Sequence, residues 1–145
     1  MSAGTMCSRV VVTATPDESA RVAARRMADH EVGTVVVIEP DGVREPIGIV
    51  TDRDIAIRCV AGRLDPDTNP VSRIMSTPAY SVNEDTSVEE VIAMMARAAT
   101  RRLVVIGDRH EVVGIVSLDD IVDLLVTEAR SIGHLLERQQ PHLSA

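Results

Sequence analysis

The stretch GIVTDRDI at residues 48–55 returns as GIVSLDDI at residues 114–121, and this repetition decides the fold. Working outward, GTVVVI at 33–38 returns as RRLVVI at 101–106, and DESARVAARRM at 17–27 matches DTSVEEVIAMM at 85–95. A repeat of this length indicates one supersecondary unit used twice. Each copy has only about 60 residues, which is near the lower limit for an independent core. We therefore expect the two copies to bury each other's apolar faces.

Both copies predict the same order of elements: strand, helix, strand, strand, helix. β-Branched runs between turn residues place strands at 10–14, 34–38, 46–50, 79–82, 103–106 and 112–116. Helices are expected at 52–60, with Ile55, Ala56 and Val60 on one face, and at 87–98, where Ser87 and Glu90 form a capping box. The first helix ends near His30 and begins either at Pro16 or one turn later, at Ser19.

The residues between the copies are rich in Gly, Pro, Asp and Asn, which is typical of a linker. We predict a first unit over 5–62, a linker over 63–73, a second unit over 74–126 and a C-terminal helical extension and tail over 127–145. Within the linker, Asn69 and Pro70 are expected to start a short helical turn through Met75. The alternation of strands and helices predicts an α/β (α+β) protein built of small layers.

Composition excludes several classes of function. Hydrophobic residues make up 45% of the chain, but Phe and Trp are absent and Tyr80 is the single aromatic residue, so base-stacking platforms are missing. The net charge of −7 opposes nucleic-acid binding. No stretch has the length of a membrane span and the N-terminal residues do not resemble a secretory signal, so we expect a cytoplasmic protein.

Cysteines and histidines carry little functional signal here. Cys7 and Cys59 lack a metal-type spacing, so reduced thiols are favoured over a disulfide between them. The histidines are scattered, and we expect no metal site. Gly48 and Gly114, each within the strand before the repeated motif, either let a ligand approach closely or relieve crowding in a small sheet.

The repeated motif pairs a hydroxyl with a carboxylate three residues later: Thr51 with Asp54, and Ser117 with Asp120. Residues at this spacing face the same way at the start of a helix. Two interpretations are open. The pair caps free backbone N–H groups, or the carboxylate accepts hydrogen bonds from a cis-diol such as ribose while the hydroxyl and helix N-terminus help to hold a phosphate or sugar oxygen.

The two units, each closed by G-I-V-[ST]-x-x-D-I, resemble a tandem pair of CBS domains, also called a Bateman module, over about residues 5–126. The small stand-alone pairs of the hypoxic-response type in high-GC bacteria are the most similar. The resemblance implies two β-α-β-β-α units packed with pseudo-twofold symmetry, clefts that bind AMP, ADP, ATP or S-adenosylmethionine, and homodimers. It also implies that Asp54 and Asp120 bind ribose, with Thr51 and Ser117 beside ribose or phosphate.

The segment TRRLVVI of the second unit resembles the HRLPV segment of the family, which implies that Arg102 and Arg101 reach phosphate. Guanidinium groups suit this role because they form forked hydrogen bonds. The first unit has Gly33 and Thr34 at these positions, but it has Arg53 where the second has Asp119. We therefore do not expect two equivalent sites, and the site bordered by Arg102 is predicted to be the tighter one.

The leading hypothesis is a regulatory sensor without catalytic activity or catalytic cofactor, which binds an adenine nucleotide and signals to an unknown protein partner. The alternative is an interaction protein with no small-molecule site. We predict a homodimer to which an apolar stripe on the last helix, Ala129, Ile132, Leu135 and Leu136, contributes. The stripe could instead fold back on its own chain over residues 10–12.

Overall fold

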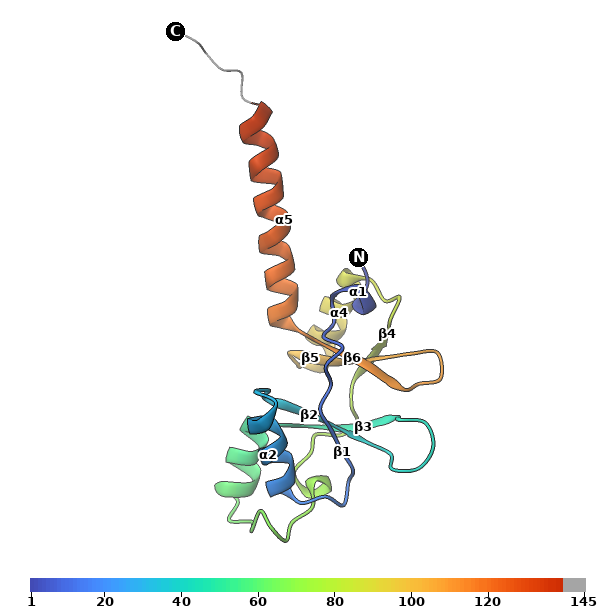
Figure 1. Cartoon of the computed structure of the whole chain (residues 1–145), viewed down its shortest axis with the longest axis vertical. Coiled ribbons are helices and arrows are strands. Elements are labelled where there is room, and N and C mark those ends of the chain that lie inside the picture. Colours follow the sequence, from blue (N-terminus) through green and yellow to red (C-terminus); the bar gives the residue numbers. More distant parts are fainter. Residues whose placement is uncertain (140–145) are drawn as a thin grey trace.

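The computed structural model describes residues 1–139 and contains two three-stranded sheets, one in each unit (Figure 1). The first unit comprises β1 (Thr13–Ala14), α2 (Ala20–Asp29), β2 (Thr34–Ile38), β3 (Pro46–Thr51), α3 (Asp52–Asp54) and a π-helical turn, η1 (Ile55–Val60). The second comprises β4 (Ser81–Asn83), α4 (Val88–Ala98), β5 (Arg102–Ile106), β6 (Val112–Ser117) and α5 (Leu118–Gln139). Two short pieces, α1 (Ala3–Met6) and a 3-10 turn η2 (Val71–Arg73), precede the two units. The predicted mixed fold of two β-α-β-β-α units is confirmed.

The two sheets have the same topology and the same register. In each, the first strand is parallel to the second and the second is antiparallel to the third. Thr34 pairs with Thr51 just as Arg102 pairs with Ser117, and both sheets carry a register shift near the far end of the second strand. The duplication seen in the sequence is therefore a duplication of backbone geometry.

The sheets pack against each other through aliphatic side chains. Val36 from β2 and Val104 from β5 are fully buried in this interface, and Ile49 and Ile115 pack against them from the third strands. Each unit also has its own core between its sheet and its helices, centred on Val35 in one and Leu103 in the other. The expectation that the copies bury each other's apolar faces is confirmed.

Serine caps define where the helices begin. The Ser19 side chain accepts a hydrogen bond from the backbone N–H of Val22 at 3.3 Å, so the first helix starts one turn after Pro16. Ser87 does the same for Glu90 at 3.3 Å and forms the predicted capping box. A side-chain acceptor at this position satisfies a backbone donor that the helix cannot satisfy itself.

Several predicted boundaries were wrong. The strands at 10–14 and 79–82 are shorter, Thr13–Ala14 and Ser81–Asn83, because the residues before them run between the two sheets. Asn69 does not cap the turn before Met75; its side-chain oxygen accepts a hydrogen bond from Arg73 at 2.7 Å.

The helix expected over 52–60 is also irregular, because after one α turn it widens into η1. Ile55 packs against the first core and Cys59 is buried in it, whereas Ala56 and Val60 are exposed, so the predicted apolar face is wrong. Cys59 is a free thiol, as is the half-buried Cys7.

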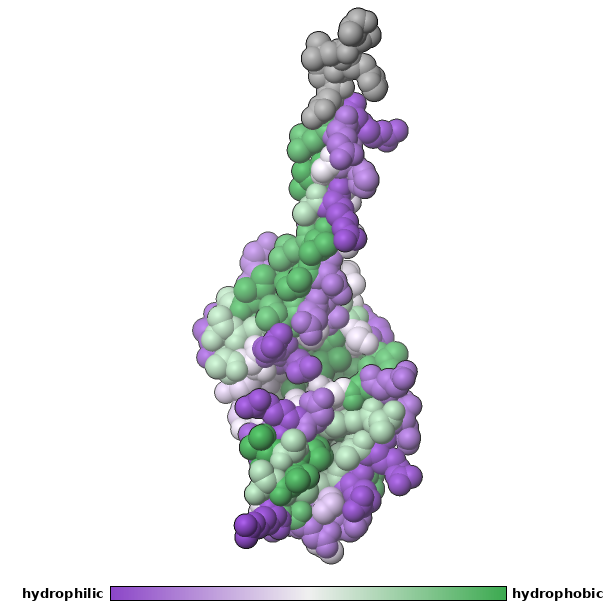
Figure 2. All heavy atoms as spheres, turned by 90° about the vertical axis from the view of Figure 1, so that its left-hand side faces the viewer, coloured by the Kyte–Doolittle hydropathy of each residue, from purple (hydrophilic) through white to green (hydrophobic). Residues whose placement is uncertain are grey.

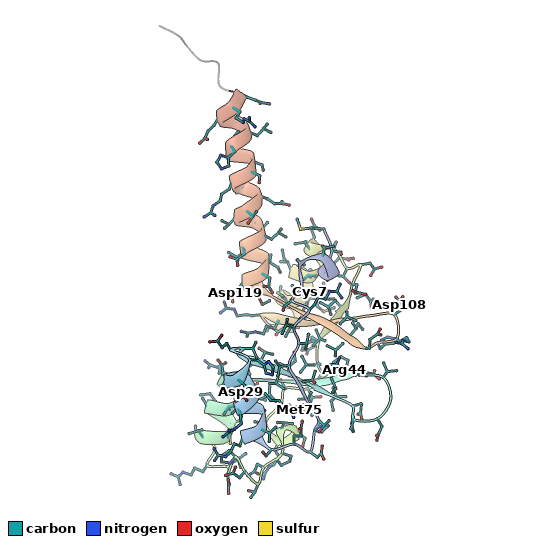
Figure 3. The ribbon with its side chains drawn as sticks, in the orientation of Figure 1. Cys7, Asp29, Arg44, Met75, Asp108 and Asp119 are labelled. Carbon is teal, nitrogen blue, oxygen red and sulfur yellow. The ribbon has the colours of Figure 1, made fainter. Side chains whose placement is uncertain are left out.

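The segments that precede the units are exchanged between them. Residues 2–8 lie before the first unit but pack on the second, where Ala3 is fully buried and Ser8 bridges Ile115 by backbone hydrogen bonds of 2.9 and 3.0 Å. The equivalent residues 70–76 lie before the second unit but pack on the first: Val71 and Ile74 are fully buried, and Ser76 bridges Ile49 in the same way. Figure 3 shows Cys7 beside the sheet of the second unit and Met75 beside that of the first. We call these two segments the arms. The predicted unit boundaries at residues 62 and 73 remain a proposal, and they divide the chain rather than the two cores.

The last helix is far longer than its counterpart, as predicted. α5 touches β6 and α1 near its start and then projects away from the rest of the molecule (Figure 1). It does not fold back over residues 10–12. Residues 140–145 of the predicted extension and tail, among them Pro141 and His142, lie outside the described residues. No helix within residues 1–139 is both long and apolar enough to cross a membrane.

Candidate functional site

Two clefts lie at the junction of the units, and each combines the repeated motif of one unit with the helix-to-strand turn of the other. The first cleft has a volume of about 420 Å³, within the range of about 300–1,000 Å³ of small-molecule sites. Thr51 and Asp54 come from the end of β3 and from α3, and the turn between α4 and β5 faces them. The remaining walls include Ser76, Thr77, Pro78 and Tyr80, none of which was predicted as a site residue.

Thr51 and Asp54 form a complete capping box. The backbone N–H of Thr51 donates to Asp54 Oδ2 at 2.9 Å, and the backbone N–H of Asp54 donates to Thr51 Oγ1 at 3.2 Å. The capping interpretation is therefore correct as far as it goes. The box engages Oδ2 of Asp54, whose side chain is 14% exposed and lines the cleft. A capping role and a ligand role are compatible for this carboxylate.

All three arginines singled out in the sequence line the first cleft. Arg53 comes from α3, whereas Arg101 lies just before β5 of the other unit and Arg102 begins it. The sequence placed them in different units, and the pseudo-twofold arrangement brings them together. Arg101 also lies 3.7 Å from Asp119, but both side chains are largely exposed. Such a pair contributes little and leaves the guanidinium available to a ligand.

The second cleft is smaller, about 230 Å³, and largely aliphatic. Asp120 Oδ2 accepts hydrogen bonds from the backbone N–H and the hydroxyl of Ser117, both at 2.7 Å. Gly33 and Thr34 take the places that Arg101 and Arg102 have in the first cleft. The hydroxyl of Thr34 is buried and has no hydrogen-bond partner within the described residues. Arg102 lines both clefts, so this residue alone does not distinguish them.

Sequence reasoning missed Arg58, which contacts the carboxylate of the first cleft. Its Nε lies 3.7 Å from Asp54 Oδ1, and its Nη1 donates to the backbone oxygen of Ile74 at 2.9 Å. Arg58 thus links Asp54 to the arm that continues into the cleft wall. The acid-to-arginine spacing of four residues was the available signal. The second unit has Leu124 at the equivalent position, so Asp120 lacks this neighbour.

Other chemistry near the clefts is limited. Burial raises the pKa of the Cys7 thiol, which keeps this side chain protonated at neutral pH beside the second cleft. Within residues 1–139, no three His, Cys, Asp or Glu side chains gather closely enough to hold a metal ion. The arrangement supplies carboxylates, hydroxyls and guanidinium groups, which are suited to binding a sugar phosphate.

Comparison with known proteins identifies the family. The CBS domain model matches residues 3–60 and 71–127. The chain is 41% identical over 111 residues to the CBS domain-containing protein YhcV of Bacillus subtilis, covering 77% of this chain and 76% of that protein. It is 34% identical over 104 residues to Hypoxic response protein 1 of Mycobacterium tuberculosis, covering 72% and 71%. An uncharacterized protein of Methanopyrus kandleri, MK0525, is 36% identical over 124 residues; the match covers 86% of this chain but only 62% of that protein.

Solved structures lead to the same family. The CBS domain protein PAE2072 from Pyrobaculum aerophilum, complexed with AMP, superposes with a TM-score of 0.75 at 30% identity, covering 83% of this chain and 89% of that one. The CBS domain pair of protein MJ0100, in complex with 5'-methylthioadenosine and S-adenosyl-L-methionine, gives a TM-score of 0.74 at 25% identity, covering 86% and 99%. With its duplicated motif, exchanged arms and paired clefts, this chain belongs to the CBS domain family as a tandem pair.

Proposed function

We propose that the protein is a regulatory sensor that binds an adenine nucleotide, AMP, ADP or ATP, in the first cleft. The observation that carries the proposal is the convergence of Asp54, Arg53, Arg101 and Arg102 on one cleft. The carboxylate accepts hydrogen bonds from the ribose hydroxyls, and the guanidinium groups bind the phosphates. Similarity to PAE2072 supports this assignment because that protein is complexed with AMP.

The two clefts are proposed to differ in affinity. The first has three arginines and the larger volume, whereas the second has Arg102 together with an aliphatic wall. Phosphate groups favour the first cleft because each guanidinium adds a charge-assisted hydrogen bond. An adenine nucleotide therefore binds the first cleft more tightly. The signal then passes through contacts of a homodimer or with a protein partner.

Replacing the two motif carboxylates separates ribose binding from helix capping. The amide oxygen of Asn can still accept the hydrogen bond from the backbone N–H of Thr51 or Ser117, so Asp54→Asn and Asp120→Asn should both melt close to the unmodified protein. Nucleotide at 100 times its Kd stabilises the unmodified fold by about 2.7 kcal/mol, a rise in Tm of roughly 2–4 °C per kcal/mol. Asp54→Asn should lose this rise and Asp120→Asn should keep most of it.

Thermal melting with AMP, ADP, ATP and S-adenosylmethionine checks the proposal. A full rise in Tm for Asp54→Asn would show that this carboxylate does not hold the ribose. If none of these compounds raises the Tm of the unmodified protein, the alternative function holds, and the chain is an interaction protein that works without a small molecule.

A further inference from the structure

The projecting helix α5 carries an apolar stripe that nothing in the chain covers within the described residues. Six of its apolar residues follow alternating spacings of four and three, and the exposed Val126 and Leu135 flank them. The six are Leu118, Val122, Leu125, Ala129, Ile132 and Leu136. The stripe residues from Val122 onward are exposed, and Leu125, Ile132 and Leu136 are each more than half exposed. Figure 2 shows the stripe as an apolar band that continues from the body along the helix.

This spacing is the pattern of a helix that packs along another helix. A stripe that recurs every 3.5 residues stays on one side of a supercoiled pair, whereas a single helix that covers a globular core has a wider apolar face. The opposite face carries polar side chains that form hydrogen bonds within the helix. The hydroxyls of Thr127 and Ser131 donate to backbone oxygens one turn earlier, at 2.9 and 3.1 Å. The expected occupant of the stripe is therefore a second helix of matching length.

The charges on α5 indicate which helix packs on the stripe and in which direction that helix runs. Within residues 122–139, Asp123 lies at the start of the projecting helix and Arg138 at its tip. A parallel pair would set each of these charges beside its own copy. An antiparallel pair that brings the tip of each helix to the start of the other sets Asp123 beside Arg138 of the partner subunit, which is electrostatically favourable.

We propose that residues 122–139 of α5 pair antiparallel with the same residues of a second copy of the chain. In the register that brings the helix tip to the point where α5 leaves the body, Leu125 packs against Leu136 of the partner subunit. Ala129 packs against Ile132 of the partner subunit, so a small residue faces a large one at the centre. This inference rests on the homodimer in the proposed function and deepens it by naming the contact and its direction.

Cysteine cross-linking tests the direction and the register together. Two proteins are made in a Cys7→Ser background, one with Leu125→Cys and one with Leu136→Cys; the buried Cys59 is kept. Eleven residues of helix span about 16 Å, so in the antiparallel pair neither protein forms a disulfide with its own kind. When they are mixed under reducing conditions and then oxidised, the mixed disulfide should form in high yield.

Substitutions on the two faces provide the control. Adding Ile132→Glu to both proteins should abolish the mixed disulfide, whereas adding Ser131→Glu on the polar face should leave it. Disulfides within each protein alone would indicate a parallel pair and overturn the proposal. A mixture that fails to cross-link also overturns it, even when sedimentation shows a dimer, because that dimer must then form through another face and the nucleotide proposal is untouched.

Discussion

At the scale of single residues, the phosphate end of the first cleft depends on guanidinium groups that come from both units. Arg53 and Arg101 line only the first cleft, whereas Arg102 lines both. Arg53→Gln and Arg101→Gln should each weaken ATP binding roughly 10- to 100-fold, since a hydrogen bond to a charged group is worth about 1.5–3 kcal/mol. Adenosine, which has no phosphate, should bind each variant as it binds the unmodified protein.

Isothermal titration calorimetry with ATP and with adenosine measures both affinities. Arg97→Gln is the matched control, because Arg97 is an exposed arginine of α4 that does not line the cleft. Equal loss of ATP and adenosine affinity in the two cleft variants would mean that these arginines shape the cleft rather than bind phosphate.

Glu18 and Arg26 give a second prediction at this scale. Arg26 donates to Glu18 at 2.5 and 2.7 Å and also to the backbone oxygen of Thr13, so the pair joins α2 to β1. The hydrogen bond from Arg26 lowers the pKa of Glu18 below its usual value of 4.5. Glu18→Gln should lower the free energy of unfolding by about 1 kcal/mol at pH 7, since both side chains are partly exposed.

The pH dependence has a definite sign. A lowered folded-state pKa stabilises the protein above the unfolded-state pKa, and this contribution is lost as the pH falls through the folded value. The difference between Glu18→Gln and the unmodified protein should therefore shrink from pH 5 to pH 3 in urea unfolding. Glu39→Gln, in the exposed turn after β2, should show little difference at either pH. A difference for Glu18→Gln that stays constant down to pH 3 would contradict the ion-pair account.

Single residues also show how much of the candidate site could be predicted from the sequence. Asp54 and Asp120 were found because the motif occurs twice, and Arg101 and Arg102 because of a family resemblance. Their arrangement could not be read in the same way, because it depends on which unit's turn faces which motif. Arg58 was missed although its spacing of four residues from Asp54 suits a helical pair, because its contact with the backbone oxygen of Ile74 in the arm follows only from the packing.

At the scale of elements, each arm packs tightly against the glycine of the strand before the motif. A Cβ on Gly48 would lie 2.6 Å from Met75 Sδ and 3.0 Å from the backbone oxygen of Ser76. A Cβ on Gly114 would lie 2.5 Å from Cys7 Sγ and 3.0 Å from the backbone oxygen of Ser8. Of the two explanations open for these glycines, relief of crowding fits these contacts, and the crowding comes from an arm.

Alanine substitutions should therefore have opposite effects at different glycines. Gly48→Ala and Gly114→Ala should each destabilise the fold by about 1–3 kcal/mol, because the arm must shift to admit the methyl group. Gly133→Ala should stabilise α5 by about 0.5–1 kcal/mol, since its Cβ meets nothing within 4 Å and Ala favours a helix. Urea unfolding measures all three. Unchanged stability in Gly48→Ala would mean that the arm is not tightly held.

Elements with strong local signals were predictable and the others were not. The capping side chains of Ser19 and Ser87 mark the starts of their helices. Continuous aliphatic runs in the sequence mark the β2 and β5 strands. The arms carry no such signal: residues 2–8 and 70–76 are short, mostly irregular and recognisable as equivalent only after the packing is known. The widening at η1 was equally hidden, because the composition of Ile55–Val60 suits an ordinary helix.

At the scale of the whole molecule, the exchange of arms decides which fragments can fold. Residues 1–65 contain every strand of the first unit but lack Val71 and Ile74, which are fully buried in its core. Residues 9–76, a fragment of similar length, contain the complete core and omit the arm that belongs to the other unit. We expect fragment 9–76 to give a stronger helical circular dichroism signal than fragment 1–65. Fragment 9–76 should melt in a broader transition than the whole chain, whereas fragment 1–65 is poorly folded.

Both fragments leave the inter-sheet face around Val36 and Ile49 exposed, so neither should reach the Tm of the whole chain. A fragment 1–65 that melts as cooperatively and at the same temperature as the whole chain would contradict the requirement for both the arm and the second unit. The duplication predicted the mutual packing of the units, but the identity of the pieces that complete each core follows only from three-dimensional packing.

The exchange also sets a conflict between the order of synthesis and the order of folding. Once Ser76 has left the ribosome, the first unit has every piece of its core. The arm at residues 2–8 emerges before that, yet the β6 strand that receives it at Ile115 is translated more than a hundred residues later. At about 5–20 residues per second, this arm waits on the order of 5–20 seconds with Ala3 and Met6 in water. It is made before every residue of the unit it completes, and its partner strand β6 exists only when that unit is nearly finished.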